Sequence, residues 1–65
     1  MRLWIARDSY GLWLFRRKPT KYISNGDNCF NKAGNTRYSI DSQLYPEITF
    51  ENSPQLVEIQ LIKRA

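Results

Sequence analysis

The residues best suited to chemistry in this chain are cations that lie next to aromatic side chains. The cations are Arg16, Arg17, Lys18 and Lys21, and the neighbouring rings are Trp13, Phe15 and Tyr22. Small β-domains can hold single-stranded nucleic acid with such a set, because the cations follow the phosphates and the rings stack on the bases. A single-stranded nucleic-acid site along a basic strand edge is therefore one hypothesis.

The same segment also has a simpler interpretation, which we rank higher. Trp13 and Phe15 alternate toward the interior of the expected strand, where they would be core residues. Lysine and arginine on an edge strand commonly protect a sheet against pairing with other sheets. No cold-shock or RNP-like aromatic motif accompanies the cluster. Core packing with edge protection is therefore preferred to nucleic-acid binding.

The sequence offers few groups for catalysis. It contains no histidine, which removes Ser-His and Cys-His nucleophile pairs and most zinc sites. Cys29 is the only cysteine, and we interpret it as a small apolar side chain under a loop rather than a reactive thiol. The acidic residues Asp41, Glu47 and Glu51 fall on faces expected to be solvated. We therefore expect a protein that is not an enzyme, with no metal, cofactor or small-molecule substrate.

A protein-binding surface is the function that we favour. Tyr10 lies at the tip of an expected hairpin, and Trp4 or Tyr45 is a ring that the fold can leave exposed. Aromatic and arginine side chains are frequent anchors of protein interfaces, so we expect contacts from Trp4, Tyr10, Arg16 and Arg17. Self-association is the simplest form of such binding, because an open strand edge can pair with a second copy.

Length and composition limit the other possibilities. The chain has 65 residues, enough for one domain spanning 1–65, and it is 42% hydrophobic and 14% aromatic, as in a globular protein. Its formal charge of +4 suits an acidic partner but is also an ordinary margin for solubility. A lone cysteine favours a reducing compartment, and no apolar run has the length of a signal peptide or a membrane span. We expect a soluble cytoplasmic domain with no membrane contact.

The elements that must position these residues begin with a β-hairpin between Arg2 and Lys18. Two apolar runs, 3–6 and 12–15, flank Asp8-Ser9-Tyr10-Gly11, which has the chemistry of a type I turn. A three-residue loop is favoured, and it pairs Asp8 with Leu12, Ala6 with Leu14 and Trp4 with Arg16. A two-residue loop would shift every pair by one position. The expected faces are Leu3, Ile5, Trp13 and Phe15 on one side and Trp4, Ala6, Leu12 and Leu14 on the other. Because both faces are apolar, each needs a cover, and the turn at 42–46 and the polar stretch 27–36 are the candidates for the second one.

The rest of the chain also reads as short strands. Alternation and β-branched content predict strands at 21–24, 37–41, 47–51 and 55–63. The polar stretch 27–36 is either a long loop or an irregular hairpin. One helical turn is expected near residues 42–45, before Pro46. The predicted fold class is all-β, with a single small antiparallel sheet of five or six short strands that is curled or barrel-like.

The residues also resemble a known group of proteins. The shared features are Trp4-Ile5-Ala6-Arg7-Asp8, then Gly11, Trp13-Leu14-Phe15 and Lys18-Pro19, and later Asp41-Ser42 and Leu44-Tyr45-Pro46-Glu47-Ile48-Thr49-Phe50-Glu51. In these features the chain is similar to small uncharacterised proteins of gut Bacteroidetes and their phages or mobile elements. The resemblance covers nearly the whole chain except 25–36. It implies a stand-alone domain encoded by a phage or mobile element, and it assigns no functional residue.

Overall fold

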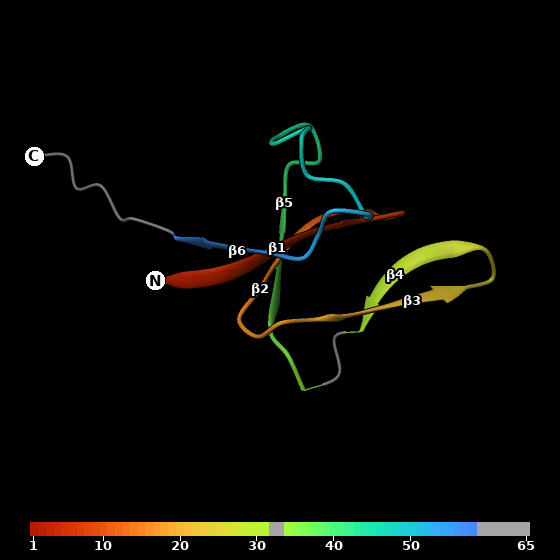
Figure 1. Cartoon of the computed structure of the whole chain (residues 1–65), viewed down its shortest axis with the longest axis horizontal. Coiled ribbons are helices and arrows are strands. Elements are labelled where there is room, and N and C mark those ends of the chain that lie inside the picture. Colours follow the sequence, from red (N-terminus) through yellow and green to blue (C-terminus); the bar gives the residue numbers. More distant parts are fainter. Residues whose placement is uncertain (32–33, 59–65) are drawn as a thin grey trace, which may run out of the picture.

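The computed structural model describes residues 1–31 and 34–58, and every regular element within them is a β-strand. The strands are β1 (Arg2–Asp8), β2 (Gly11–Phe15), β3 (Thr20–Ser24), β4 (Asp27–Asn31), β5 (Arg37–Ile40) and β6 (Gln55–Glu58). One antiparallel sheet of four strands has the order β5-β2-β1-β6, and a second sheet pairs β3 with β4 (Figure 1). The all-β class is confirmed. The expected single curled sheet is not, because the described strands form two sheets that do not close into a barrel.

The hairpin of β1 and β2 forms as predicted, but the predicted register is wrong by one residue. Trp4 pairs with Phe15 and Ala6 with Trp13, so the loop contains two residues rather than three. The carboxylate of Asp8 explains the tighter loop, because its Oδ1 accepts hydrogen bonds from the Tyr10 and Gly11 amides at 2.8 and 3.1 Å. Because strand side chains alternate, Trp13 and Phe15 now share a face with Trp4 and Ala6, and Leu12 and Leu14 share the other face with Leu3 and Ile5.

One side of the four-stranded sheet, here called the aromatic face, is covered by the β3-β4 hairpin. Its central residues are Trp4, Ala6, Trp13 and Phe15. Phe30 of β4 packs on them, with its ring centroid 6.2 Å from that of Phe15. The ring of Phe50 lies 5.3 Å from Phe30 on the same cluster. The turn between β1 and β2 is also tied to β4, by hydrogen bonds between Ser9 and Asn28.

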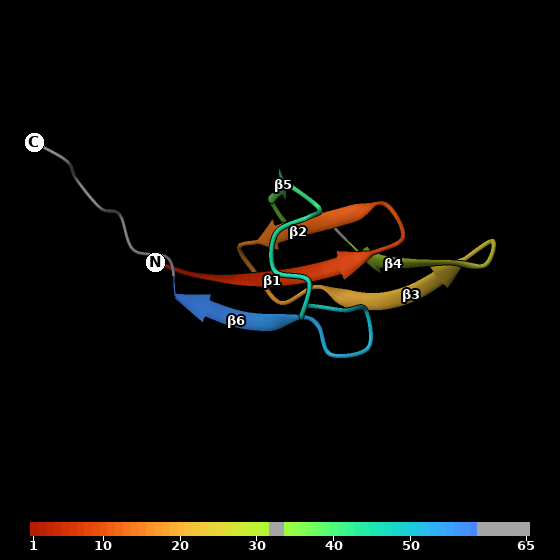
Figure 2. The same cartoon turned by 90° about the horizontal axis from the view of Figure 1, so that it is seen from above.

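The opposite side, here called the aliphatic face, is covered by the chain between β5 and β6. Ile48 from this connection is buried against Ile5 and Leu12, and the remaining apolar side chains packed there are Leu14, Ile40 and Val57. Figure 2 shows the connection, here called segment 41–54, passing from β5 across β2 and β1 toward β6. The expectation that each face of the hairpin is covered is therefore met by two different parts of the chain.

Segment 41–54 contains turns where one helical turn and one strand were expected. The Leu44 amide donates to the Asp41 carbonyl at 3.1 Å, and the φ angle of 49° at Tyr45 stops any helical continuation. The strand expected at 47–51 is absent because Asn52 takes main-chain groups that a ladder would need. Its side-chain Nδ2 donates to the Glu47 carbonyl at 2.8 Å, and its side-chain Oδ1 accepts from the Thr49 amide, also at 2.8 Å.

The other strand predictions are largely confirmed. β3 covers the predicted 21–24, and Asn25 and Gly26 have the positive φ angles, 52° and 82°, of a tight hairpin turn. Neither alternative at 27–36 is confirmed, because 27–31 is the single strand β4, which pairs with β3 across the turn at Asn25 and Gly26. β5 matches the predicted 37–41 to within one residue. β6 confirms the start of the strand predicted at 55–63, and 59–63 lie outside the described residues.

Candidate functional site

An apolar groove with a volume of about 600 Å³ lies on the aliphatic face. Its floor is formed by Ile5, Leu14, Ile40 and Val57, which come from β1, β2, β5 and β6. Its wall is segment 41–54, which contributes the side chains of Leu44 and Tyr45. Both wall side chains are about half exposed, at 48% and 52%. The groove thus has apolar groups that water can still reach.

Arg7 of β1 holds the wall in place through main-chain atoms. Its Nε donates to the Ile48 carbonyl at 2.6 Å and its Nη1 to the Ser42 carbonyl at 2.8 Å. Its Nη2 donates to the carbonyls of Leu44 and Tyr45 at 2.9 and 3.2 Å. A guanidinium presents five N–H donors in a fixed plane, so it can satisfy several carbonyls that belong to no strand. The Arg7 guanidinium therefore fixes the path of the wall through its carbonyls, and the Arg7 amide adds a hydrogen bond to Ser53 Oγ at 3.3 Å.

Sequence reasoning missed the role of Arg7, although a signal was present. Arg7 follows Leu3 and Ile5 at intervals of two, so it points to the same face as these buried residues. A cation at an inward position of a central strand needs acceptors. The sequence indicates that need but does not show which carbonyls meet it.

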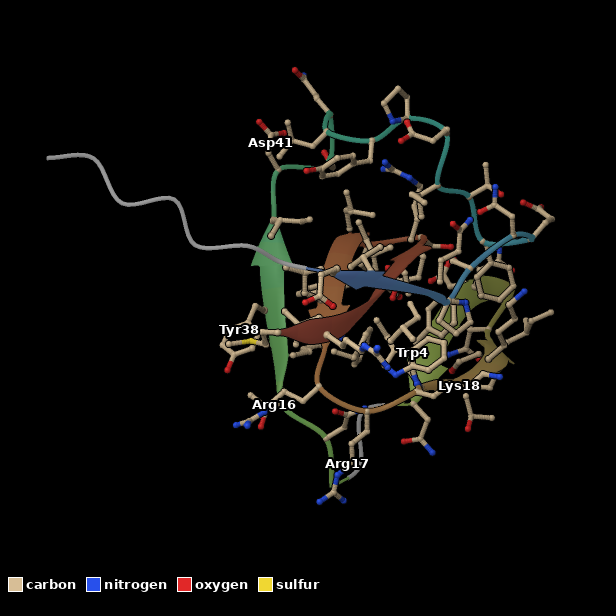
Figure 3. The ribbon with its side chains drawn as sticks, turned by 60° about the vertical axis from the view of Figure 1, so that its left-hand side comes forward. Trp4, Arg16, Arg17, Lys18, Tyr38 and Asp41 are labelled. Carbon is tan, nitrogen blue, oxygen red and sulfur yellow. The ribbon has the colours of Figure 1, made fainter. Side chains whose placement is uncertain are left out.

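Trp4, Lys18 and Lys21, three of the predicted binding residues, lie at the aromatic cluster. Lys18 Nζ stands 5.5 Å from the centroid of the Trp4 ring (Figure 3), and Lys21 Nζ stands 5.0 Å from that of Phe50. Lys21 also donates to the Glu51 carbonyl at 3.0 Å. These lysines are therefore brought to aromatic rings, but the rings are Trp4 and Phe50 rather than the expected Trp13, Phe15 and Tyr22, and the lysines lie over them. A base stacking on these rings would have to displace the lysines.

The Trp13 ring also has a cation over it. The guanidinium carbon of Arg37 lies 3.8 Å from the centroid of this ring, and the indole Nε1 donates to Asp8 Oδ1 at 3.0 Å. Trp13 packs against the aromatic cluster and is partly buried. Its predicted place in the core is confirmed only in part, since Trp13 packs against the buried cluster without being fully buried, whereas Phe15 is fully buried.

Arg16 and Arg17 form a separate group, at the exposed end of β2. With Gly34, Asn35 and Thr36 they line a polar hollow of about 430 Å³. Asn35 clamps the main chain of Arg17, since its Oδ1 accepts from the Arg17 amide at 3.1 Å and its Nδ2 donates to the Arg17 carbonyl at 2.8 Å. The Arg16 amide donates to the Thr36 carbonyl at 3.2 Å. The main chain is thus fixed while both arginine side chains are exposed, as Figure 3 shows.

Tyr10 lies apart from the other predicted residues, at the tip of the β1-β2 hairpin. Its ring is exposed, and its hydroxyl donates to Asp27 Oδ2 at 2.6 Å. This hydrogen bond, together with the negative charge of Asp27, raises the pKa of Tyr10. The side chain therefore links the hairpin tip to β4. The six predicted binding residues do not form one site.

Two further features complete the description. Within residues 1–31 and 34–58, no three or more His, Cys, Asp or Glu side chains come together as a metal site would require. In the same residues the structure contains no helix with the length and apolar character needed to cross a membrane.

Comparison with protein-family models, with curated proteins and with solved structures found no match for this chain.

Proposed function

We propose that this chain is a small non-enzymatic binding domain whose partner is a protein. The observation that supports this function is the apolar groove on the aliphatic face, with about 600 Å³ of open volume and the half-exposed Leu44 and Tyr45 on its wall. Concave apolar surfaces of this kind are typical of sites that receive side chains from a partner. If a phage or mobile element encodes the chain, a host protein is the natural partner.

The charges beside the groove define the partner further. Glu58 lines the groove but already binds the N-terminal ammonium at 3.3 Å, so its charge is largely matched. Glu47 is exposed on the wall and forms no ion pair among the described residues. A partner segment with apolar side chains and one adjacent cation would therefore complement the groove in shape and charge.

Peptide display against the whole chain tests this proposal, followed by measurement of the affinity of the selected peptides. We expect peptides rich in Leu, Ile and Phe, with a Lys or Arg beside the apolar positions. Leu44→Glu should weaken their binding at least tenfold, because it puts a carboxylate on the wall. The matched control is Leu56→Glu, since Leu56 is 50% exposed against 48% for Leu44 but lies on the other face of β6.

The two variants separate the possible outcomes. Loss of binding in Leu44→Glu with retention in Leu56→Glu supports the groove. Equal retention in both variants places the binding surface elsewhere and contradicts the proposal. A library that yields no apolar peptide also contradicts it.

Nucleic-acid binding is a second candidate, supported by the hollow beside Arg16 and Arg17. Their exposed guanidinium groups could contact phosphate, whereas the rings of Trp4 and Phe50 already have lysines over them. Titration of a short labelled oligonucleotide at low and moderate salt measures this activity. Phosphate binding requires an affinity that falls steeply with salt and is lost in the Arg16→Gln, Arg17→Gln double variant. Absence of binding at low salt removes this candidate.

A further inference from the structure

The outer edge of β5 has main-chain groups in a defined arrangement. β5 is the last strand on its side of the sheet, and no described strand pairs with its outer edge. The hydrogen bond from the Arg16 amide to the Thr36 carbonyl continues the ladder between β2 and β5 by one pair. Because bonded and non-bonded pairs alternate in an antiparallel ladder, Tyr38 and Ile40 direct their N–H and C=O groups toward β2. The N–H and C=O groups of Arg37 and Ser39 therefore point outward.

We infer that this edge pairs with β5 of a second copy of the chain, antiparallel and centred on Ser39. Five residues carry the complementarity: when two copies of Arg37-Tyr38-Ser39-Ile40-Asp41 run antiparallel about Ser39, each residue meets a suitable partner from the other copy. In this register Ser39 faces Ser39 of the second copy across a hydrogen-bonded pair. Arg37 faces Asp41 and Tyr38 faces Ile40, and each of these pairs occurs twice because the contact has two-fold symmetry.

The side chains of the edge suit these pairs. Tyr38 is 48% exposed and Ile40 is half-buried, so pairing removes apolar surface from water. An aromatic and a β-branched residue opposite each other are a favourable cross-strand pair, most of all at a non-bonded position, where side chains lie closest. Figure 3 shows Tyr38 beside β5 and Asp41 just beyond the end of this strand.

The two charged residues are also placed for the contact. Asp41 is exposed, and one of its carboxylate oxygens accepts from the Gln43 amide at 2.9 Å, which leaves the other oxygen for a partner. Arg37 lies over the Trp13 ring at 3.8 Å. Stacking uses the flat face of a guanidinium and leaves N–H donors in its plane. The main chain and the charges therefore favour the same arrangement.

The charges also reject the alternative registers. The outward N–H and C=O groups belong to Arg37 and Ser39. Hydrogen-bonded pairs with a second copy can therefore form only between odd-numbered positions of this edge. Centring the contact on Arg37 places two like charges opposite each other, which is destabilising. Centring it on Tyr38 pairs Arg37 with Ser39 and leaves Asp41 without its cation. The register centred on Ser39 alone matches both charges.

The resulting dimer would join two four-stranded sheets into one continuous sheet, with both grooves open on the same side, because the two-fold axis is perpendicular to the sheet. This inference goes beyond the proposed function and rests on different residues. A monomer could still bind a partner in the groove, and a dimer could form without one. The two experiments can therefore fail independently.

Sedimentation of the full chain over a series of concentrations tests the inference. Wild type should show a dimer that dissociates on dilution. Asp41→Arg and Arg37→Asp should each raise the dimer dissociation constant about tenfold or more, because each places like charges opposite each other twice. Mixing the two variants should restore dimers, since each chain then supplies the charge that the other lacks. Restoration also shows that both variants are folded.

Disulfide crosslinking tests the register directly. In the inferred dimer, Ser39→Cys places two thiols at an antiparallel bonded pair with Cα atoms about 5.5 Å apart, within reach of a disulfide. Tyr38→Cys places them diagonally at about 7 to 8 Å, outside that reach. Wild type, in which Cys29 is buried, is the background control. A monomeric wild type at all concentrations, mixed variants that stay monomeric, or faster crosslinking through Tyr38→Cys would each overturn the inference.

Discussion

At the scale of single residues, the Arg7 side chain connects β1 to segment 41–54. It donates to carbonyls of Ser42, Leu44, Tyr45 and Ile48, which lie 35 to 41 residues further along the chain. The alternation of β1 was sufficient to place Arg7 inward beside Ile5. Its acceptors could not be predicted, because they are main-chain atoms of turns that carry no distinctive side-chain pattern. Long-range polar contacts of this kind are determined by tertiary structure rather than by local sequence.

Replacing Arg7 should therefore destabilise the whole domain. Arg7→Met keeps most of the apolar stem but removes every donor, and we expect a loss of about 2 to 3 kcal/mol in the free energy of unfolding. Arg7→Lys should recover only part of this, since an ammonium cannot reproduce the planar set of donors. Urea unfolding measures both variants. Equal stability of Arg7→Lys and wild type would show that charge alone, and not donor geometry, holds the wall.

Tyr10 gives a prediction about pH. Its pKa is raised above the ordinary 10.0, first by its hydrogen bond to Asp27 and then by the charge of Asp27. A group whose pKa is higher in the folded state holds its proton more tightly there, so its contribution is complete below the unfolded pKa and is lost as pH rises through the folded value. The stability difference between wild type and Tyr10→Phe should therefore be constant near neutral pH and shrink above pH 10.

Thermal unfolding of both proteins over a series of alkaline buffers measures this difference. Asp27→Asn in the same series is the control, because it keeps an acceptor for the hydroxyl but removes the charge. A difference between wild type and Tyr10→Phe that grows with rising pH would have the wrong sign and would contradict the assignment.

At the scale of elements, local patterns predicted which strands exist better than they predicted register. Apolar alternation found β1, β2, β3 and β5. β4 was left open, because Cys29 and Phe30 are its only apolar residues. The register of the first hairpin was missed because Asp8 supports a loop of either length in sequence terms. In the structure its carboxylate collects three N–H donors, from Tyr10, Gly11 and Trp13, which fixes the two-residue loop.

The turn between β3 and β4 provides a test of a single element. Gly26 has a φ of 82°, and a Cβ added there would meet nothing within 4 Å. Gly26→Ala should therefore cost about 1 kcal/mol through backbone conformation alone. A synthetic chain with D-alanine at this position is the matched control, because it adds the same methyl group and favours positive φ. Chemical denaturation compares the three proteins. Equal losses for both alanines would indicate a steric cause instead.

At the scale of the whole molecule, two sheets share one aromatic cluster. The sequence predicted that both faces of the first hairpin need a cover, and that expectation was correct in physical terms. The turn at 42–46 and the polar stretch 27–36 were the candidate covers, but which face each one covers was not predicted, because Phe30 and Phe50 reach the cluster from segments whose own patterns are weak. The groove was missed for a related reason. Alternation placed Ile40 and Val57 on apolar strand faces, and Tyr45 was a candidate exposed ring, but nothing local indicated that Leu44 and Tyr45 would stand beside Ile40 and Val57.

Phe30 should determine whether the smaller sheet remains attached to the larger one. Phe30→Ala removes the ring between Phe15 and Phe50, at a cost of about 3 to 5 kcal/mol. A two-stranded hairpin is marginal by itself, so amides of β3 and β4 should lose protection from hydrogen exchange before those of β1 and β2. Exchange measured by NMR resolves the strands. Simultaneous loss of protection in all strands would show that the two sheets unfold as one unit.

The guanidinium of Arg7 donates only to carbonyl groups of the wall, and every amino acid supplies a carbonyl. The anchoring of segment 41–54 by this guanidinium thus imposes no requirement on the exposed side chain at position 44. Related chains could exchange the residue at position 44 for another and keep the same backbone trace, whereas the φ of 49° at position 45 restricts the replacements there. Arg7 would then fix the backbone of a recognition surface whose exposed side chain can change. Framework and hypervariable positions have the same relation in an immune receptor.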